Sequence, residues 1–354
     1  MSDDEYADDF DTGAADDVLD ADGVVNAVAV DIPLAVGKIA VSATATINIS
    51  ELQLGRLRGG GTFACVYEAV WTLSGERVAV KTLADASVDE AAKAAFNAEL
   101  RALAGAGSHP NVLRLIGSCL HPRPAIVTEL LGVTVAEALA RGPPGGASRG
   151  APWPLNTVLR WATGVAAAVA HLHALPIPLL HRDIKSANIL LRSVVGAGSE
   201  AVLADFGLAG SKERAAGTPT HLAPELWAAS DGAHALLGRG ADVYALGVCM
   251  WSFFAGLEPW AGWTVADIKT AVMAGKRPES SRMRTDTPPQ LHALLARAMA
   301  AELSDRPSAA EILIQLSEAH VEAVKAAALQ ASSARAAPID ALDAALGMGP
   351  KRKK

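Results

Sequence analysis

The hydrophobic pattern of the chain changes from a strand-like period to a helical one near its middle. Between Leu52 and about Lys81, short β-type runs such as ACVYEAVW and ERVAVKTL are separated by glycine-rich and Ser-Gly turns, which predicts an antiparallel meander. Farther along, apolar residues recur at helical spacing, and helices are expected at 155–175, 241–255, 264–274, 288–301 and 308–330. We therefore expect an α+β chain with a small β-rich lobe followed by a larger helical lobe.

The β-rich part contains one helical interruption. The run VDEAAKAAFNAELRALAGAG, from Val88, has apolar residues at helical spacing and ends at glycines. After it, NVLRLIGSCL and PAIVTELL have the composition of two further strands. These patterns predict a five-stranded sheet with a single helix, and the Gly- and Pro-rich run 142–153 that follows is expected to be a loop.

Charge is distributed unevenly over the 354 residues, whose formal net charge is −7. Residues 1–22 hold ten acids and no Lys or Arg, so the 31 basic residues face 28 acids elsewhere and the remainder carries +3. We interpret residues 1–23 as a solvated, disordered tail, with a partner-binding tail as the alternative. Residues 24–50 are β-prone and stay unassigned.

Several classes of protein are disfavoured by composition. Three widely spaced cysteines, Cys65, Cys119 and Cys249, fit a reducing compartment better than a disulfide framework or a zinc site. The start MSDDEYADDF is unlike a signal peptide, and apolar runs are too short or interrupted for a membrane span. We expect a cytoplasmic protein without a nucleic-acid partner, and interpret the final KRKK as solvated charge or a weak nuclear signal.

Two short motifs place acids and an amide next to apolar strands. HRDIKSANILL carries Asp183, Lys185 and Asn188 immediately before one strand, and ADFGLA places Asp205 immediately after another. Carboxylate and amide oxygens are suitable ligands for Mg²⁺, and a lysine among them suits phosphate. Each residue alone is an ordinary turn residue, but the combination predicts a phosphate and metal site.

These motifs resemble the catalytic loop and metal-binding loop of the eukaryotic protein kinase family, over roughly Leu52 to Leu316. The resemblance implies the bilobal kinase fold, with ATP and Mg²⁺, or Mn²⁺ in its place, as cofactors. It further implies that Asp183 orients or accepts the proton of the substrate hydroxyl, that Lys185 assists, and that Asn188 and Asp205 hold the metal.

The same resemblance assigns residues of the β-rich lobe to the nucleotide. Lys81 would contact the α and β phosphates and pair with Glu99 on the following helix. Thr128 is at the gatekeeper position, with Glu129 and Leu131 bonding adenine through their backbones. The implied nucleotide-binding set is Arg58, Gly59, Gly60, Gly61, Thr62, Phe63, Ala64, Cys65, Val66, Ala79, Lys81, Thr128, Glu129, Leu131 and Leu190.

The glycine-rich run departs from the family pattern. Ala64 stands where the third glycine is usual, and we expect at worst a weaker affinity for nucleotide. Arg58 stands where an apolar residue usually covers adenine, and Leu57 takes that place in an alternative alignment.

Three further motifs resemble structural features of the family. APE at 223–225 would end the activation segment, and Arg306 would pair with its glutamate, Glu225. Asp242 would begin a buried helix and tether the catalytic loop, while its simpler interpretation is a helix N-cap. The predicted kinase domain is 51–318, divided into lobes 51–131 and 132–318, with an Ala-rich helical extension and basic tail at 319–354.

Lys185 and GTPTHLAPE resemble serine/threonine kinases, and the group with the closest motifs is the tyrosine-kinase-like one. Thr218 is expected to contact Asp183 and Lys185. Protein Ser/Thr hydroxyls are the expected substrates, and autophosphorylation is expected at Ser211, Thr218 and Thr220, with Ser211 as the regulatory position. The rival interpretations are a pseudokinase scaffold and a small-molecule phosphotransferase of similar fold.

Overall fold

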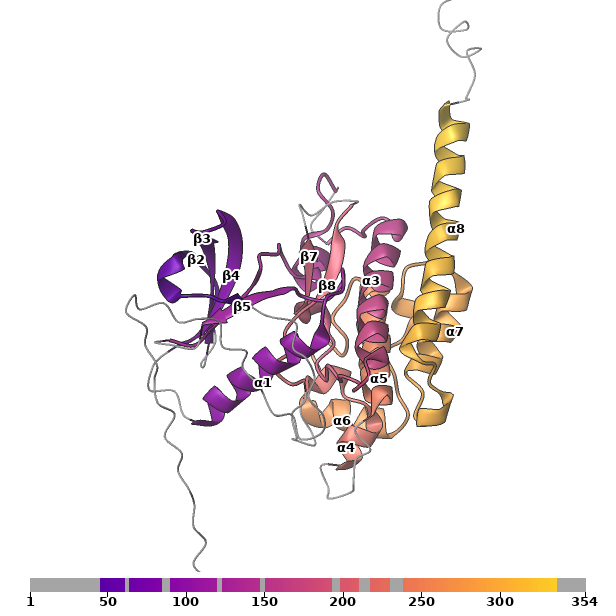
Figure 1. The fold of residues 1–354 in the computed structure, drawn as a ribbon. Helices are drawn as coiled ribbons and strands as arrows, with labels where there is room; N and C mark the ends of the chain where they lie inside the picture. Colours follow the sequence, from indigo (N-terminus) through magenta and orange to yellow (C-terminus); the bar gives the residue numbers. More distant parts are fainter. Residues whose placement is uncertain are drawn as a thin grey trace, which may run out of the picture.

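The computed structural model describes residues 45–60, 64–84, 90–119, 123–146, 150–192, 198–209, 217–229 and 238–335, with side chains up to residue 329. A β-rich lobe and a larger helical lobe lie side by side (Figure 1). The predicted α+β, bilobal architecture is therefore confirmed. The acidic tail and the terminal KRKK lie outside the described residues.

The sheet of the small lobe contains the five strands expected from the sequence and one more. Its order is β1-β5-β6-β4-β3-β2. The strands are β1 (Ala45–Thr46), β2 (Leu52–Gly60), β3 (Ala64–Trp71), β4 (Glu76–Leu83), β5 (Leu115–Cys119) and β6 (Ala125–Glu129), and the single expected helix is α1 (Glu90–Ala106).

The two faces of this sheet are used differently. Val78 and Val80 of β4 are fully buried in a core on one face, together with Ala69 and Val127. Because successive side chains of a strand point to opposite faces, Ala79 and Lys81 lie on the other face, where they line the cleft between the lobes. Lys81 is placed on this second face by the same alternation that buries its neighbours.

The extra strand comes from the segment that the sequence left unassigned. β1 pairs in parallel with β5, and the Ile47 amide donates to the Ser118 carbonyl at 2.9 Å. Ile47 is 1% exposed and belongs to the core of the sheet. A Cβ atom at Gly117 would lie 2.3 Å from the Ala45 carbonyl oxygen, so glycine is what allows this close approach.

The large lobe is built around two buried helices, α3 (Leu155–Ala174) and α5 (Arg239–Ala255), at the centre of the main core. The other helices are α2 (Val135–Arg141), α4 (Pro224–Ala229), α6 (Val265–Met273), α7 (Pro289–Ala298) and α8 (Ala309–Arg335). A hairpin of β7 (Ile189–Arg192) and β8 (Glu200–Leu203) faces the small lobe. The four expected downstream helices correspond to α5, α6, α7 and α8, whereas α2 and α4 were not predicted.

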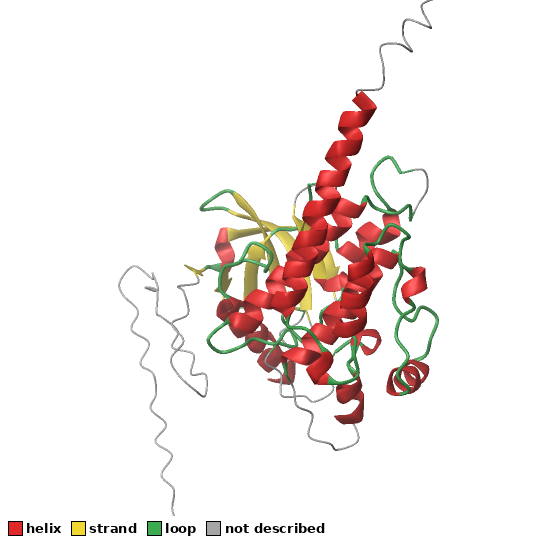
Figure 2. Cartoon of the chain, turned by 90° about the vertical axis from the view of Figure 1, so that its right-hand side faces the viewer, coloured by secondary structure: helices red, strands yellow, loops and turns green. Residues whose placement is uncertain are grey.

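The last helix, α8, packs along α3 and then continues beyond the lobe (Figure 2). Ile312, Leu316 and Ala319 are buried against the body, while Val324 and Leu329 are exposed. None of the described helices combines the length and the apolar character needed to cross a membrane.

The contact between β1 and β5 can be tested by adding one methyl group. Gly117→Ala should lower the free energy of unfolding by about 1–3 kcal/mol, because backbone and side-chain atoms of β1 must shift. Gly105→Ala is the matched control, since a Cβ at that helical position meets nothing within 4 Å. Chemical denaturation of both variants measures the difference, and equal stability of the two would contradict the docked position of β1.

Candidate active site

A cleft of about 690 Å³ is enclosed by β2, β3 and β4, the segment joining the lobes, and the β7 and β8 loops. Nine residues of the predicted nucleotide-binding set line it: Arg58, Gly59, Val66, Ala79, Lys81, Thr128, Glu129, Leu131 and Leu190. Glu99, Asn188 and Asp205 line it as well. Residues predicted from motifs far apart in sequence therefore surround a single cleft.

Some predicted residues lie elsewhere. Gly60, Ala64 and Cys65 are described but are not among the lining residues, and Gly61, Thr62 and Phe63 lie outside the described residues. Ala64 pairs with Leu83 within the sheet. Leu57, the alternative residue for the place over the base, is 51% exposed and is not among the residues that line the cleft, whereas Arg58 is.

Sequence reasoning missed part of the cleft wall. The missed lining residues include apolar Leu103, Leu113 and Ile126, and polar Arg56, Glu137 and Arg141. The apolar ones carry the periodicity of buried strand and helix positions, which does not distinguish a cleft wall from a core. Glu137 and Arg141 lie on α2, a helix that was not predicted.

Lys81 and Glu99 form an ion pair inside the cleft. The Lys81 Nζ lies 2.6 Å from both carboxylate oxygens of Glu99. Burial is the largest influence on Glu99 and raises the pKa of its carboxyl, while Lys81 opposes that shift. The pair fixes a cation of the small lobe at a defined place and ties β4 to α1.

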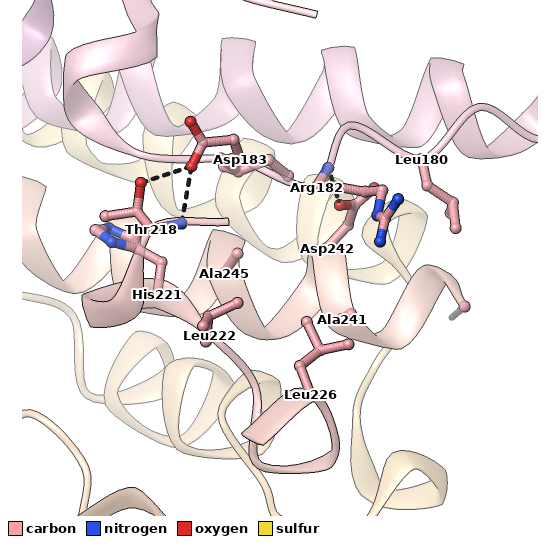
Figure 3. A pocket seen from close by; sticks show the side chains of 12 residues that line it. Leu180, Arg182, Asp183, Thr218, His221, Leu222, Leu226, Ala241, Asp242 and Ala245 are labelled. Atoms are coloured by element: carbon pink, nitrogen blue, oxygen red, sulfur yellow. Dashed lines mark hydrogen bonds between the residues drawn. The ribbon is translucent and has the colours of Figure 1, made fainter. Parts of the chain in front are cut away.

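Asp183 is held by four hydrogen bonds. Its Oδ2 accepts from Lys185 Nζ at 2.7 Å and from Asn188 Nδ2 at 2.8 Å. Its Oδ1 accepts from the Thr218 hydroxyl at 2.6 Å and the Thr218 amide at 3.1 Å, as drawn in Figure 3. Lys185 also donates to the Thr218 hydroxyl at 2.7 Å, so the three side chains form a closed network. The expected contacts of Thr218 are present.

These donors keep Asp183 ionised. Burial alone would raise the pKa of its carboxyl, but the hydrogen bonds and charge of its partners, Lys185 first among them, outweigh burial and lower it. Because the folded pKa is depressed, the resulting stabilisation is present above the ordinary pKa of an aspartate and is lost as the pH falls through the folded value. At neutral pH the side chain is a carboxylate.

The loop that carries Asp183 is anchored to a buried carboxylate on α5. Asp242 is 2% exposed, and its oxygens accept from the backbone amides of His181 at 2.9 Å and Arg182 at 2.8 Å. They also accept from His173 Nε2 at 3.0 Å. Burial favours the neutral carboxyl, yet the His173 bond and the neighbouring donors lower its pKa. The tether expected from the sequence is therefore present, whereas the N-cap interpretation is wrong: the N-cap of α5 is Gly238, and Asp242 lies inside the first turn of the helix.

Asn188 and Asp205 offer oxygen atoms suited to a divalent cation. The Asn188 amide nitrogen donates to the Asp183 carbonyl and carboxylate, which leaves the amide oxygen without a partner among the described residues. The Asp205 carboxylate is contacted in the described structure by the Gly207 amide at 3.4 Å. Hard oxygen donors of this kind fit Mg²⁺.

Asp205 is held by its backbone conformation and by the loop that carries Asp183. Its φ is 61°, in the left-handed region that residues other than glycine rarely adopt. The preceding carbonyl, from Ala204, accepts from His181 Nε2 at 3.0 Å. His181 thereby links the loop of Asp183 to the loop of Asp205.

A second, much smaller cavity of about 20 Å³ lies beside Asp183 (Figure 3). Apolar side chains form much of its wall: Leu180, Leu222, Leu226, Ala241 and Ala245. His221 also lines it, and burial lowers the pKa of the imidazole to about 4. At neutral pH His221 is uncharged and adds no positive charge next to Asp183.

The segment that carries Thr218 is fixed at its far end by a buried ion pair. Two nitrogens of Arg306 donate to the two carboxylate oxygens of Glu225, both at 2.7 Å. Arg306 also donates to the carbonyls of Gly240 and Ala300. The pairing expected for Arg306 and Glu225 is therefore present.

Comparison with known proteins adds the following. A model of the family described as protein tyrosine and serine/threonine kinase matches residues 52–316. Mitogen-activated protein kinase kinase kinase 10 of Mus musculus is 36% identical over 228 residues, covering 60% of this chain and 22% of that protein. Mitogen-activated protein kinase kinase kinase 11 of Rattus norvegicus is 31% identical over 281 residues, covering 76% and 31%.

A putative serine/threonine-protein kinase/receptor of Acanthamoeba polyphaga mimivirus is 28% identical over 323 residues, covering 88% of this chain and 18% of that protein. The chain spans between 18% and 31% of the length of these three relatives. Their similarity therefore concerns one part of much longer proteins.

The buried pair of Arg306 and Glu225 predicts a large loss of stability when one charge is removed. Glu225→Gln should lower the free energy of unfolding by about 3 kcal/mol, because it leaves the buried guanidinium without a counter-charge. Glu322→Gln breaks the exposed pair with Lys325 and should change it by less than about 1 kcal/mol. Thermal or denaturant unfolding compares the two, and a cost at Glu225 no larger than at Glu322 would contradict the role given to the buried pair.

Proposed function

The chain belongs to the protein tyrosine and serine/threonine kinase family, and we propose that it transfers the γ-phosphate of ATP to Ser or Thr hydroxyl groups of protein substrates. The observation that carries this proposal is the convergence of Lys81, Glu99, Asn188 and Asp205 on one cleft, with Asp183 bonded directly to Asn188. A scaffold without turnover has no need to preserve all of these contacts together.

The small lobe would hold the nucleotide. Val66 and Ala79 on one side and Leu190 on the other give the cleft apolar walls suited to a base. Leu131 lines the cleft, and its amide donates no hydrogen bond within the described part of the chain, so the amide would be available to an acceptor on the base. Lys81, held by Glu99, would contact the phosphates.

Asn188 and Asp205 would hold the metal through the amide oxygen and the carboxylate. A Mg²⁺ ion bound there would neutralise charge on the phosphates of ATP. These two residues come from loops that are joined through the bond between His181 and the Ala204 carbonyl. The site therefore depends on the same loop that presents Asp183.

Asp183 would orient the acceptor hydroxyl and take up its proton. The four hydrogen bonds of Asp183 occupy about as many positions as a carboxylate has lone pairs. An incoming hydroxyl must therefore share or replace one of these donors. The ionised state of Asp183 at neutral pH suits this role.

Ser/Thr rather than Tyr specificity is proposed from Lys185 and Thr218. Both contact Asp183, so they occupy the space next to the reacting hydroxyl and favour a short acceptor side chain. The names of two relatives describe kinases that act on protein kinases, which supports a protein substrate over a small molecule. Ser211, the expected regulatory position, lies outside the described residues, and its phosphorylation stays a prediction.

Replacing the carboxylate of Asp183 by an amide tests this proposal. We expect Asp183→Asn to lower phosphate transfer from Mg²⁺-ATP to a generic protein by about 100- to 10 000-fold, since the proton acceptor is lost. Its nucleotide affinity should be unchanged, because Asp183 is not among the residues that line the cleft. Labelled transfer and calorimetric nucleotide binding are the two measurements.

The matched control is Asp286→Asn, an exposed aspartate on the large lobe that should leave transfer intact. Phosphoserine and phosphothreonine, without phosphotyrosine, are the expected products in the acceptor protein. Equal labelling by wild type and Asp183→Asn would favour the pseudokinase scaffold, and phosphotyrosine as the main product would contradict the Ser/Thr assignment.

A further inference from the structure

The last described helix, α8, carries two apolar stripes on roughly opposite sides. The first stripe is buried against the body of the large lobe and includes Ile312, Leu316 and Ala319. The second, the outer stripe, is exposed to solvent and consists of Ile314, Val321, Val324 and Ala328. A helix needs one apolar side to pack on its own domain, so this packing does not account for the outer stripe.

The outer stripe has the spacing that lets two helices pack along each other. Its four residues follow at steps of seven, three and four along the sequence. Such steps correspond to the a and d positions of a heptad, which form the seam between paired helices. Ile314, Val321 and Val324 are 57%, 52% and 45% exposed, so the seam is uncovered over several turns.

The outer part of α8 receives no burial from the rest of the described structure. Every described side chain from Val324 to Leu329 is exposed, and the helix continues to Arg335 beyond the body of the lobe (Figure 2). Isolated helices shorter than about 12–15 residues are marginal in water, because packing of an apolar face supplies most of the stability of a helix. A second helix along the outer stripe would supply that packing.

Charges beside the outer stripe favour a second copy of α8 that runs antiparallel to the first. Glu318 and Lys325 are seven residues apart and therefore lie on the same edge of the stripe, next to its d positions. When Val321 of one helix lies beside Val324 of an antiparallel copy, each Glu318 faces the Lys325 of the other helix. In a parallel pair these two edges lie on opposite sides of the seam and form no such ion pair.

The present partner of Lys325 does not prevent this contact. Its Nζ lies 2.9 Å from Glu322 Oε1 on the same helix, and the two side chains are 68% and 70% exposed. An exposed pair of this kind contributes little to stability, so Lys325 can exchange it for an acid of the second copy.

We infer that two copies of the chain associate through an antiparallel pairing of their α8 helices. Each copy offers the same outer stripe and the same two charges, so the contact is self-complementary and closes as a two-fold symmetric dimer. The projecting end of each helix covers Ile314 on the body-bound part of the other. None of the described residues of α8 lines the cleft, so association leaves the cleft open. This inference goes beyond the proposed function and does not depend on it.

Sedimentation equilibrium of the full chain tests the inference. The wild type should pass from one to two chains per particle between about 1 and 100 µM, since a short helical contact is small and weak. Combined Val321→Glu and Val324→Glu should weaken association at least about tenfold, because carboxylates would then meet in the seam. Leu329→Glu is the matched control: this residue is 71% exposed but lies off the outer stripe, and its variant should associate as the wild type does.

Exchange of the two charges tests the direction of the helices. Glu318→Lys should weaken association about three- to tenfold, because lysines then face each other. Adding Lys325→Glu should restore it, since each ion pair forms again with its signs reversed. Unfolding curves show that each variant is folded, as expected for exposed side chains.

Four results would overturn the inference. A wild type that stays a single chain at every concentration would refute the dimer, and a dimer unaffected by the two valine substitutions would place the contact elsewhere. An equal loss in Leu329→Glu would contradict the outer stripe as the seam. Unchanged association of Glu318→Lys would contradict the antiparallel direction.

Discussion

The loop that carries Asp183 depends on one buried carboxylate, that of Asp242. It accepts two backbone amides from the loop and the ring nitrogen of His173, all within the main core. An ionised group in such a place is stable only if donors surround it, so the loop backbone cannot leave without exposing an unpaired buried charge. Arg182 has a φ of 68°, which is unfavourable for a residue other than glycine, and the hydrogen bond from its amide to Asp242 holds it there. The position of Asp183 follows from that of its two neighbours.

Further hydrogen bonds link the loop that Asp242 holds to the other residues of the site. His181 reaches the loop of Asp205, and Asp183 reaches Thr218, whose segment ends at Glu225 and its buried arginine. On the other side of the cleft, Lys81 and Glu99 join the sheet to α1. The network around Asp183 and the pair of Lys81 and Glu99 are thus held by separate sets of contacts in the two lobes.

A third network sets how the two lobes meet. Arg192, at the end of β7, donates to both carboxylate oxygens of Glu129 and to the Pro110 carbonyl of the loop after α1. Burial alone would lower the pKa of Arg192, but Glu129 and Glu200 outweigh it, so the guanidinium stays charged. Because Glu129 belongs to the segment that borders the cleft, this ion pair ties the cleft wall to the large lobe.

Much of this arrangement could be predicted because a few motifs combine residue type with spacing. Asp183, Asn188 and Asp205 were identifiable because turns next to apolar strands place them at one end of the hairpin. Other features depend on pairing register that no local pattern records. Irregularities in the pairing of β2 with β3 place Arg58 at the cleft and leave Leu57 exposed. The pairing of β1 with β5 likewise requires a glycine at position 117, because a Cβ atom there would clash with Ala45.

Local sequence patterns also do not reveal contacts between residues that are far apart in the chain. Glu129 is predicted to bind adenine through its backbone, and the structure adds that its side chain pairs with Arg192, 63 residues away. No motif singles out His221, and only the folded chain shows that it is buried next to the network of Asp183. Contacts over such separations follow from tertiary packing and not from local sequence preference.

The dependence of catalysis on the buried carboxylate is tested most directly by steady-state kinetics of Asp242→Asn. An amide keeps the shape of the side chain but replaces one acceptor oxygen by a donor, so one loop contact must be lost. We expect kcat for phosphate transfer to fall by about 100-fold, the scale of a small misplacement of a reacting group, while KM for ATP stays near the wild-type value. An unchanged kcat in a folded Asp242→Asn protein would contradict the account.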